Sequence, residues 1–240
     1  MNSSVGLNNL SNREKWIRKT LSNIPSNSRI LDAGAGEKKY KLYCSHLKYV
    51  SQDFGQYEGV GDGKGLQTGS WDQLQLDIMS DITNIPESDS SFDAIMCIEV
   101  LEHLPEPIKA IQEFSRLIKP DGFLILSAPF CSLTHMAPYH YYSGFNQYFF
   151  DRFLKENDFT LLECVPNGNY FEYIAQEIHR IPDVASNYSD QTPLNRLDRF
   201  GISLVLKTLQ KLSDNNRGSE DLLHCGYHIF AQKFGNSNKK

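Results

Sequence analysis

The chain has 240 residues, a formal net charge of -5 and five cysteines. This length accommodates one α/β domain with an insertion, and such a chain can bury a substantial core. The acidic balance, with no basic block except the terminal Lys239-Lys240, argues against bulk RNA or DNA as a partner. The cysteines are scattered without C-x-x-C spacing, which indicates reduced thiols in a cytoplasmic protein. No apolar run has membrane-spanning length and the first residues lack a signal-peptide layout, so we expect a soluble protein.

The first predicted element is a helix over residues 11–24, with Ser11 as its N-cap and Glu14 completing a capping box. Short apolar runs then predict strands over 29–33, 48–53, 78–81, 92–98 and 122–129. A helix over 149–157 and strands over 159–165 and 226–233 complete the series. This alternation predicts an α/β fold with a mainly parallel sheet and helices on both of its faces.

A glycine turn, Asp32-Ala33-Gly34-Ala35-Gly36, follows the first predicted strand directly. The dinucleotide fingerprint requires a third glycine where this chain has Lys39, which argues against a nicotinamide oxidoreductase. The carboxylates of Asp32 and Glu37 would repel a phosphate but suit a cation. S-adenosylmethionine (SAM), with its sulfonium and ammonium groups, fits this turn better than NAD.

The turn resembles motif I of the class I SAM-dependent methyltransferases, and the resemblance continues in order over residues 28–165, with features of the type 11 family. It implies a Rossmann-like, doubly wound, mainly parallel seven-stranded sheet whose last strand is antiparallel. Asp53, roughly 20 residues beyond the glycines, is expected to bind the ribose hydroxyls. The predicted cofactor-binding residues are Asp32, Gly34, Ala35, Gly36, Asp53, Asp81, Ile82 and Glu99.

The segment Glu99-Val100-Leu101-Glu102-His103 carries the candidate catalytic groups. His103 can act as a general base toward an acceptor hydroxyl, with His140 as a second catalytic residue. The E-x-x-E-H spacing also resembles the metal-binding motif of small-RNA 2'-O-methyltransferases and of ubiquinone-pathway O-methyltransferases. That resemblance implies a divalent metal at Glu99, Glu102, His103 and His140, with His135 competing for the last place. We predict His103 as a base without metal; a plain helix start is the structural alternative.

An aromatic segment follows the fifth strand. We expect the side chains of residues 139–142 to line the acceptor pocket, and Phe145, Phe149 and Phe150 to be core residues of the next helix.

The interval of about sixty residues before the last strand is the main departure from the minimal family pattern. We treat residues 1–240 as a single domain with a helical insertion at 168–224, containing helices at 170–181 and 199–212 and a polar segment at 182–193. The insertion is expected to cap the acceptor side of the cofactor cleft; a surface helical pair without substrate contact is the alternative. Because helix 199–212 is apolar on more than one face, it should be buried or should meet a membrane or lipid tail, and burial is favoured.

The sequence thus predicts a SAM-dependent methyltransferase that acts on a small-molecule, sugar or lipid-linked acceptor, at oxygen. The alternatives are N- or C-methylation, and a SAM-binding protein without turnover.

Overall fold

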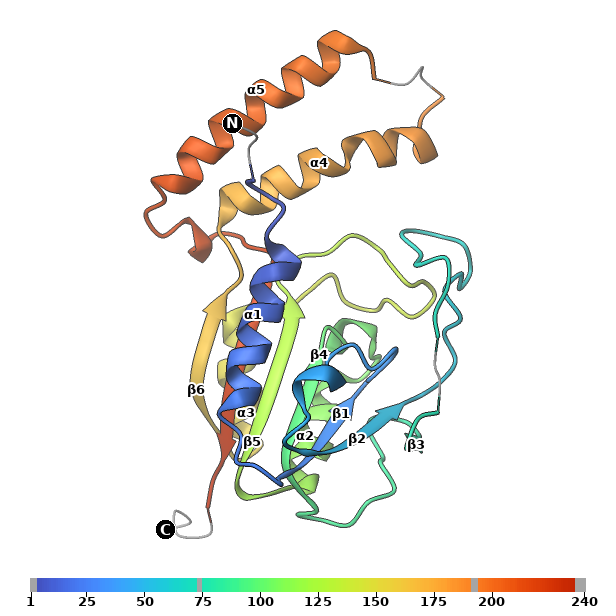
Figure 1. The fold of residues 1–240 in the computed structure, drawn as a ribbon, viewed down its shortest axis with the longest axis vertical. Helices are drawn as coiled ribbons and strands as arrows, with labels where there is room; N and C mark the ends of the chain where they lie inside the picture. Colours follow the sequence, from blue (N-terminus) through green and yellow to red (C-terminus); the bar gives the residue numbers. More distant parts are fainter. Residues whose placement is uncertain (1–3, 73–74, 191–193, 236–240) are drawn as a thin grey trace. The chain divides into compact units, whose positions relative to one another are not determined.

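The computed structural model describes residues 4–72, 75–190 and 194–235. In this part of the chain, seven strands form one sheet in the order β3-β2-β1-β4-β5-β7-β6 (Figure 1). The strands are β1 (Arg29–Ala33), β2 (Lys48–Asp53), β3 (Ile78–Met79), β4 (Phe92–Ile98), β5 (Ile118–Pro129), β6 (Phe159–Pro166) and β7 (Gly226–Lys233). Strands β1 to β5 pair in parallel, and β7 is antiparallel to β5. The predicted Rossmann-like, mainly parallel seven-stranded sheet, with its antiparallel last strand, is confirmed.

Helices cover both faces of this sheet because alternate strand residues are apolar on each side. On one face, Ala94 and Met96 of β4 share a buried cluster with Trp16 and Ile17 of α1 (Asn9–Ser22). On the other face, the intervening Ile95 belongs to the cluster that α2 (Pro107–Leu117) and α3 (Gln147–Glu156) build. The carboxyl ends of the parallel strands are thereby held at one edge, where ligands of such sheets bind.

Several predicted boundaries shift. Helix α1 begins at Asn9, so the interpretation of Ser11 as the N-cap is wrong: its Oγ donates to the carbonyl of Asn8 inside the helix start. The predicted strand 78–81 shortens to Ile78–Met79, since β3 pairs with β2 only at the last two residues of β2. Strand β5 extends back to Ile118, and α3 begins at Gln147.

The chain divides into two compact units. One contains the sheet, from Trp16 to Val165 and from Gly226 onward; the other joins the first residues, up to Lys15, to Pro166–Cys225. The prediction of a single domain with a capping insertion is not decided by this division and stays a prediction.

The smaller unit is built around α4 (Tyr170–Tyr188) and α5 (Arg196–Asp214), which pack side by side (Figure 1). Helix α4 continues through Pro182, so most of the predicted polar segment 182–193 is helical; residues 191–193 lie outside the described part. The N-terminal segment contributes Val5, which is buried with Ala175, Leu206 and Leu209. No described helix is long and apolar enough to cross a membrane.

Candidate active site

The glycine turn after β1 needs glycine at two positions. Gly34 and Gly36 have φ angles of +76° and +47°, in the left-handed region that side chains disfavour. A Cβ on Gly34 would lie 2.5 Å from a methyl of Val100, and one on Gly36 would lie 2.5 Å from the ring of Trp71. The Gly34 amide donates to the carbonyl of Gln52 at 2.9 Å. The turn is therefore packed against two side chains and tied to the end of β2.

The carboxylate of Asp53 holds this turn from the next strand. Its Oδ2 accepts from the Gly36 amide at 2.9 Å, and its Oδ1 accepts from the Gly55 amide at 3.0 Å. The residue is only 7% exposed. Each carboxylate oxygen can accept more than one hydrogen bond, so the predicted ribose contact remains compatible with these two bonds.

Asp32 lies behind the turn as a buried carboxyl. It is 2% exposed, and its Oδ2 accepts a 2.6 Å hydrogen bond from the Tyr49 hydroxyl. Burial raises the pKa of Asp32 to about 7; the negative charge of Asp53 acts in the same direction, and the Tyr49 bond opposes both. A cationic ligand nearby would favour the ionised form of this carboxyl.

Trp71 is a site residue that sequence reasoning missed. It packs on Gly36 and meets the buried Tyr57 ring edge-on at 5.6 Å. The adjacent Asp72 amide donates to the carboxylate of Glu37 at 3.0 Å. Both aromatic residues lie in the connection between β2 and β3, which contains six glycines between positions 55 and 69. That glycine density, with aromatics interleaved, was the signal available in the sequence.

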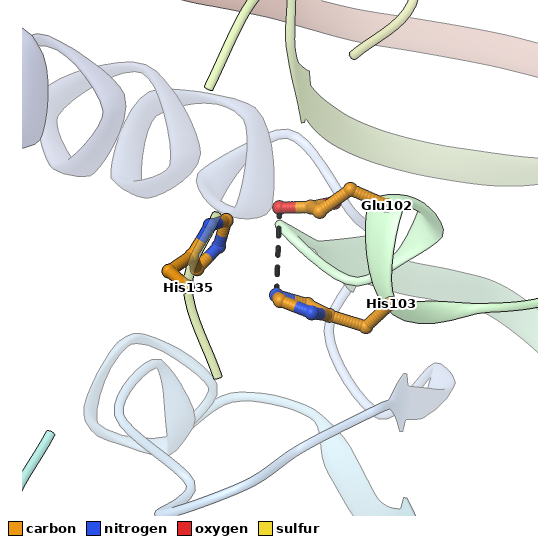
Figure 2. A group of neighbouring side chains, drawn as sticks. All are labelled: Glu102, His103 and His135. Carbon is orange, nitrogen blue, oxygen red and sulfur yellow. Dashed lines mark ion pairs between the residues drawn. The ribbon is translucent and has the colours of Figure 1, made fainter. Parts of the chain in front are cut away.

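Three histidines gather beyond the end of β4. His103 belongs to the short 3-10 turn η2 (Leu101–His103), and its ring centroid lies 4.6 Å from that of His135 and 6.0 Å from that of His140. The His135 and His140 centroids are 4.7 Å apart. Figure 2 shows the side chains of Glu102 and His103 extending from the same turn beside the His135 ring. The segment forms its own 3-10 turn and does not start α2, which begins at Pro107. The structural alternative, in which His103 bonds the backbone, is not decided by this and stays open.

The His103 imidazole is neutral at physiological pH. Burial lowers its pKa to about 4; His135 and His140 add to the effect, and a bond to the Tyr139 carbonyl opposes it. The Nδ1 atom lies 2.5 Å from that carbonyl oxygen, so Nδ1 carries the proton and donates. The carboxylate of Glu102 approaches Nε2 only to 3.8 Å, which is too long for a hydrogen bond.

The potential metal ligands differ from the predicted set. Ligand atoms of Glu102, His103 and His135 all lie within 4.8 Å of one another. Glu99 and His140 are outside this group: the Glu99 carboxylate accepts from the Ser127 hydroxyl at 2.7 Å, and His140 Nε2 lies 3.2 Å from the Ser132 hydroxyl. His135, the weaker candidate from sequence, replaces His140 in the group.

Backbone contacts connect the histidine cluster to the glycine turn. Val100, which packs on Gly34, accepts the His103 amide at 2.9 Å through its carbonyl. Glu99, one residue earlier, has φ of +55°, a conformation that is strained for a side chain of this size and typical of functional sites. The candidate cofactor turn and the histidines are therefore neighbours within the same compact unit.

The aromatic segment folds onto this cluster. The amides of Tyr141 and Tyr142 donate to the Glu102 carbonyl, at 2.9 and 3.2 Å. The Tyr139 ring meets Phe54, the residue after Asp53, edge-on at 5.1 Å. Phe145 and Phe150 are buried and Phe149 packs against the same core. Contact of residues 139–142 with an acceptor stays a prediction.

Comparison with known proteins decides the family. A family model described as a methyltransferase domain matches residues 10–163. The chain belongs to this methyltransferase family. It is 28% identical over 161 residues to a demethylmenaquinone methyltransferase of Clavibacter sepedonicus, covering 65% of this chain and 60% of that one. It is 46% identical over 41 residues to a ubiquinone biosynthesis O-methyltransferase of Paracidovorax citrulli, covering 17% of each. The alignments thus span less than two thirds of these relatives.

The fold of the methyltransferase is also that of solved SAM complexes. The phosphoethanolamine N-methyltransferase 2 of Haemonchus contortus with SAM superposes with a TM-score of 0.53 at 14% identity, covering 94% of this chain and 53% of that one. The residues at the glycine turn fit this cofactor. Gly34 and Gly36 are held so close to Val100 and Trp71 that neither position has room for a side chain, and the nearby carboxyls of Asp32 and Asp53 suit a cationic ligand. SAM is therefore the expected methyl donor.

The remaining predicted cofactor residues are placed as follows. The Asp81 carboxylate accepts from the amide and the hydroxyl of Thr83, both at 2.8 Å, and Ile82 is buried in the core. The Ala35 amide donates to the Gln52 carbonyl at 2.8 Å. The roles of these three residues toward SAM, and that of Glu99, stay predictions.

Asp53→Ala should weaken binding of S-adenosylhomocysteine by ~2 kcal/mol or more, which is about thirtyfold in Kd, because charge-assisted bonds are lost. Calorimetry of the folded variants measures this. Asp53→Asn, which keeps one acceptor oxygen, is the matched control and should lose less. An unchanged Kd in Asp53→Ala would assign the ribose contact to another residue.

Asp32→Asn should make the methyltransferase more resistant to urea at pH 8. The pKa of Asp32 is raised from 3.8 to about 7 in the folded protein, so the ionised carboxyl destabilises the fold increasingly between these pH values. The gain should reach up to about 4 kcal/mol above pH 7 and shrink toward pH 4. Asp183→Asn, which makes the same substitution at an exposed residue of α4, is the matched control. Equal effects of Asp32→Asn at pH 8 and pH 5 would refute the assignment.

Proposed function

We propose that this methyltransferase uses SAM to methylate an oxygen of a small-molecule, sugar or lipid-linked acceptor beside the histidine cluster. The observation that carries the proposal is the gathering of His103, His135 and His140 next to the glycine turn. An acceptor hydroxyl must lose its proton during methyl transfer, and neutral imidazoles can accept it. The names of the ubiquinone and menaquinone relatives support a small-molecule acceptor and, for the former, oxygen.

SAM supplies a methyl group on a sulfonium, a good leaving group, so alignment of the acceptor provides most of the catalysis. His103 is suited to orient and deprotonate the hydroxyl, because its Nδ1 is fixed by the Tyr139 carbonyl and its Nε2 carries the lone pair. The backbone bonds from Tyr141 and Tyr142 to Glu102 hold the aromatic segment over the same turn.

The test is to incubate the protein with SAM carrying a deuterated methyl group and a small-molecule extract of the cells that produce it. Mass spectrometry then locates the label in the product. A labelled O-methyl ether or ester is the expected result. Label found only on nitrogen or carbon would correct the acceptor atom, and SAM binding with no labelled product would favour a protein without turnover.

A second candidate for the same side chains is a divalent cation held by Glu102, His103 and His135. The specific observation is a carboxylate that is 1% exposed beside two imidazoles. In each imidazole Nδ1 faces a backbone carbonyl, that of Tyr139 for His103 and that of Leu133 for His135, as in metal-binding histidines. Carboxylate and imidazole together suit a hard or borderline ion, which would lower the pKa of an acceptor hydroxyl. His103 cannot do both, because a cation and a proton would use the same lone pair on Nε2.

Calorimetric titration with Mn²⁺ separates the two roles. If the cation site exists, His135→Gln removes a ligand and should weaken Mn²⁺ binding by at least about tenfold. His140→Gln should bind Mn²⁺ as tightly as the parent chain. If His103 is a base without metal, neither variant alters Mn²⁺ binding, chelator leaves turnover intact, and His103→Ala lowers turnover about a hundredfold or more.

A further inference from the structure

Helix α5 presents two apolar faces. One face, containing Leu206 and Leu209, is buried against the rest of its own unit, and each of these residues is 8% exposed. The other face is in solvent, and its large residues are 45–79% exposed: Leu197, Phe200, Leu204, Val205 and Leu212. The sequence-based preference for burial of this helix therefore holds for one face only. We call the exposed set the outer face of α5.

A second exposed apolar stripe lies near the end of α4, in the same unit. Ile181, Val184 and Tyr188 lie on one stripe of that helix at i, i+3 and i+7, and they are 37–65% exposed. Single exposed apolar residues are ordinary, but a run along one helix face calls for an occupant.

The charges on α5 are complementary to an anionic surface. The helix carries Arg196, Arg199, Lys207 and Lys211, against Asp198 and Asp214 at its two ends. Both acids are engaged inside the helix: Asp198 accepts from the Asn195 amide in the capping box, and Asp214 accepts from Gln210. Between residues 199 and 213 there is no Asp or Glu, although the whole chain has a net charge of -5.

The same charges disfavour a second copy of the chain as the occupant. Two α5 helices packed through their outer faces would bring Lys207 and Lys211 of each copy together without a carboxylate from residues 199–213 to pair with them. A lipid surface removes this conflict, because lysine stems can extend along the apolar boundary to reach anionic head groups.

We propose that the outer face of α5 docks the protein on the surface of a bilayer with anionic head groups. The helix lies in the interface, with Phe200, Leu204 and Val205 toward the acyl boundary and the basic residues at the head groups. This surface is independent of SAM and of the acceptor, so its test does not depend on the catalytic proposal.

Flotation of the full chain with vesicles tests the docking, without SAM or acceptor. Vesicles of equimolar phosphatidylglycerol and phosphatidylcholine should bind the protein at least about tenfold more tightly than pure phosphatidylcholine vesicles. The double variants Phe200→Ser/Leu204→Ser and Lys207→Glu/Lys211→Glu should each weaken binding to the anionic vesicles by about tenfold or more. Exposed Leu162→Ser on β6 and Lys155→Glu on α3 are matched controls that should bind like the parent chain.

Circular dichroism checks that the double variants keep their helices. We expect them to do so, because the substituted residues are exposed. Equal binding to both vesicle types, or retention of binding by both double variants, would overturn the proposal. A dimer in sedimentation velocity without lipid, lost in Phe200→Ser/Leu204→Ser, would overturn it in favour of a second copy.

Discussion

The site depends on one buried carboxylate that joins two strands of the sheet. Asp53 accepts from the amides of Gly36 and Gly55, so the end of β2 holds the turn that follows β1. Hydrogen bonds to an ionised acceptor are roughly twice as strong as neutral ones, and burial reduces competition from water. Gly34 and Gly36 of this turn have left-handed backbone conformations and no side chains. Val100 therefore packs directly on Gly34, and Trp71 packs directly on Gly36.

Burial in this unit disfavours the charged forms of Asp32 and His103, and it shifts their pKa values in opposite directions. Burial raises the pKa of the Asp32 carboxyl and lowers that of the His103 imidazole, so each is pushed toward its neutral form. A cationic cofactor near the turn would restore the charge on Asp32. The neutral imidazole is the form that can accept a proton or bind a metal, and the Tyr139 carbonyl selects its tautomer. The same burial also makes His103 a weaker proton acceptor than an exposed imidazole, so positioning of the acceptor has to supply most of the catalysis.

The smaller unit has a different organisation. Its core of Val5, Ala175, Leu206 and Leu209 uses one side of α5, and the five large apolar residues of the outer face of α5 remain exposed. The exposed face of α5 buries little apolar surface within the chain, and this is why we infer an external contact for it. The basic residues along it define the chemistry of that contact.

Local pattern in the sequence determined most of the fold. Strands β1, β2, β4 and β7 begin and end at the predicted residues, because apolar runs bounded by turns specify buried strands. The ordered motifs identified the methyltransferase fold. The spacing of Gly34, Gly36 and Asp53 in the sequence likewise predicted that they lie at the same edge of the sheet. Tertiary structure alone decided that Trp71 packs on Gly36, that His135 stands in place of His140 beside Glu102 and His103, and that α5 keeps an exposed apolar face. These contacts are made by loops, or by faces whose partners lie far away in the chain. Sequence periodicity reports which residues share a strand or helix face; it does not report which distant segment will cover that face.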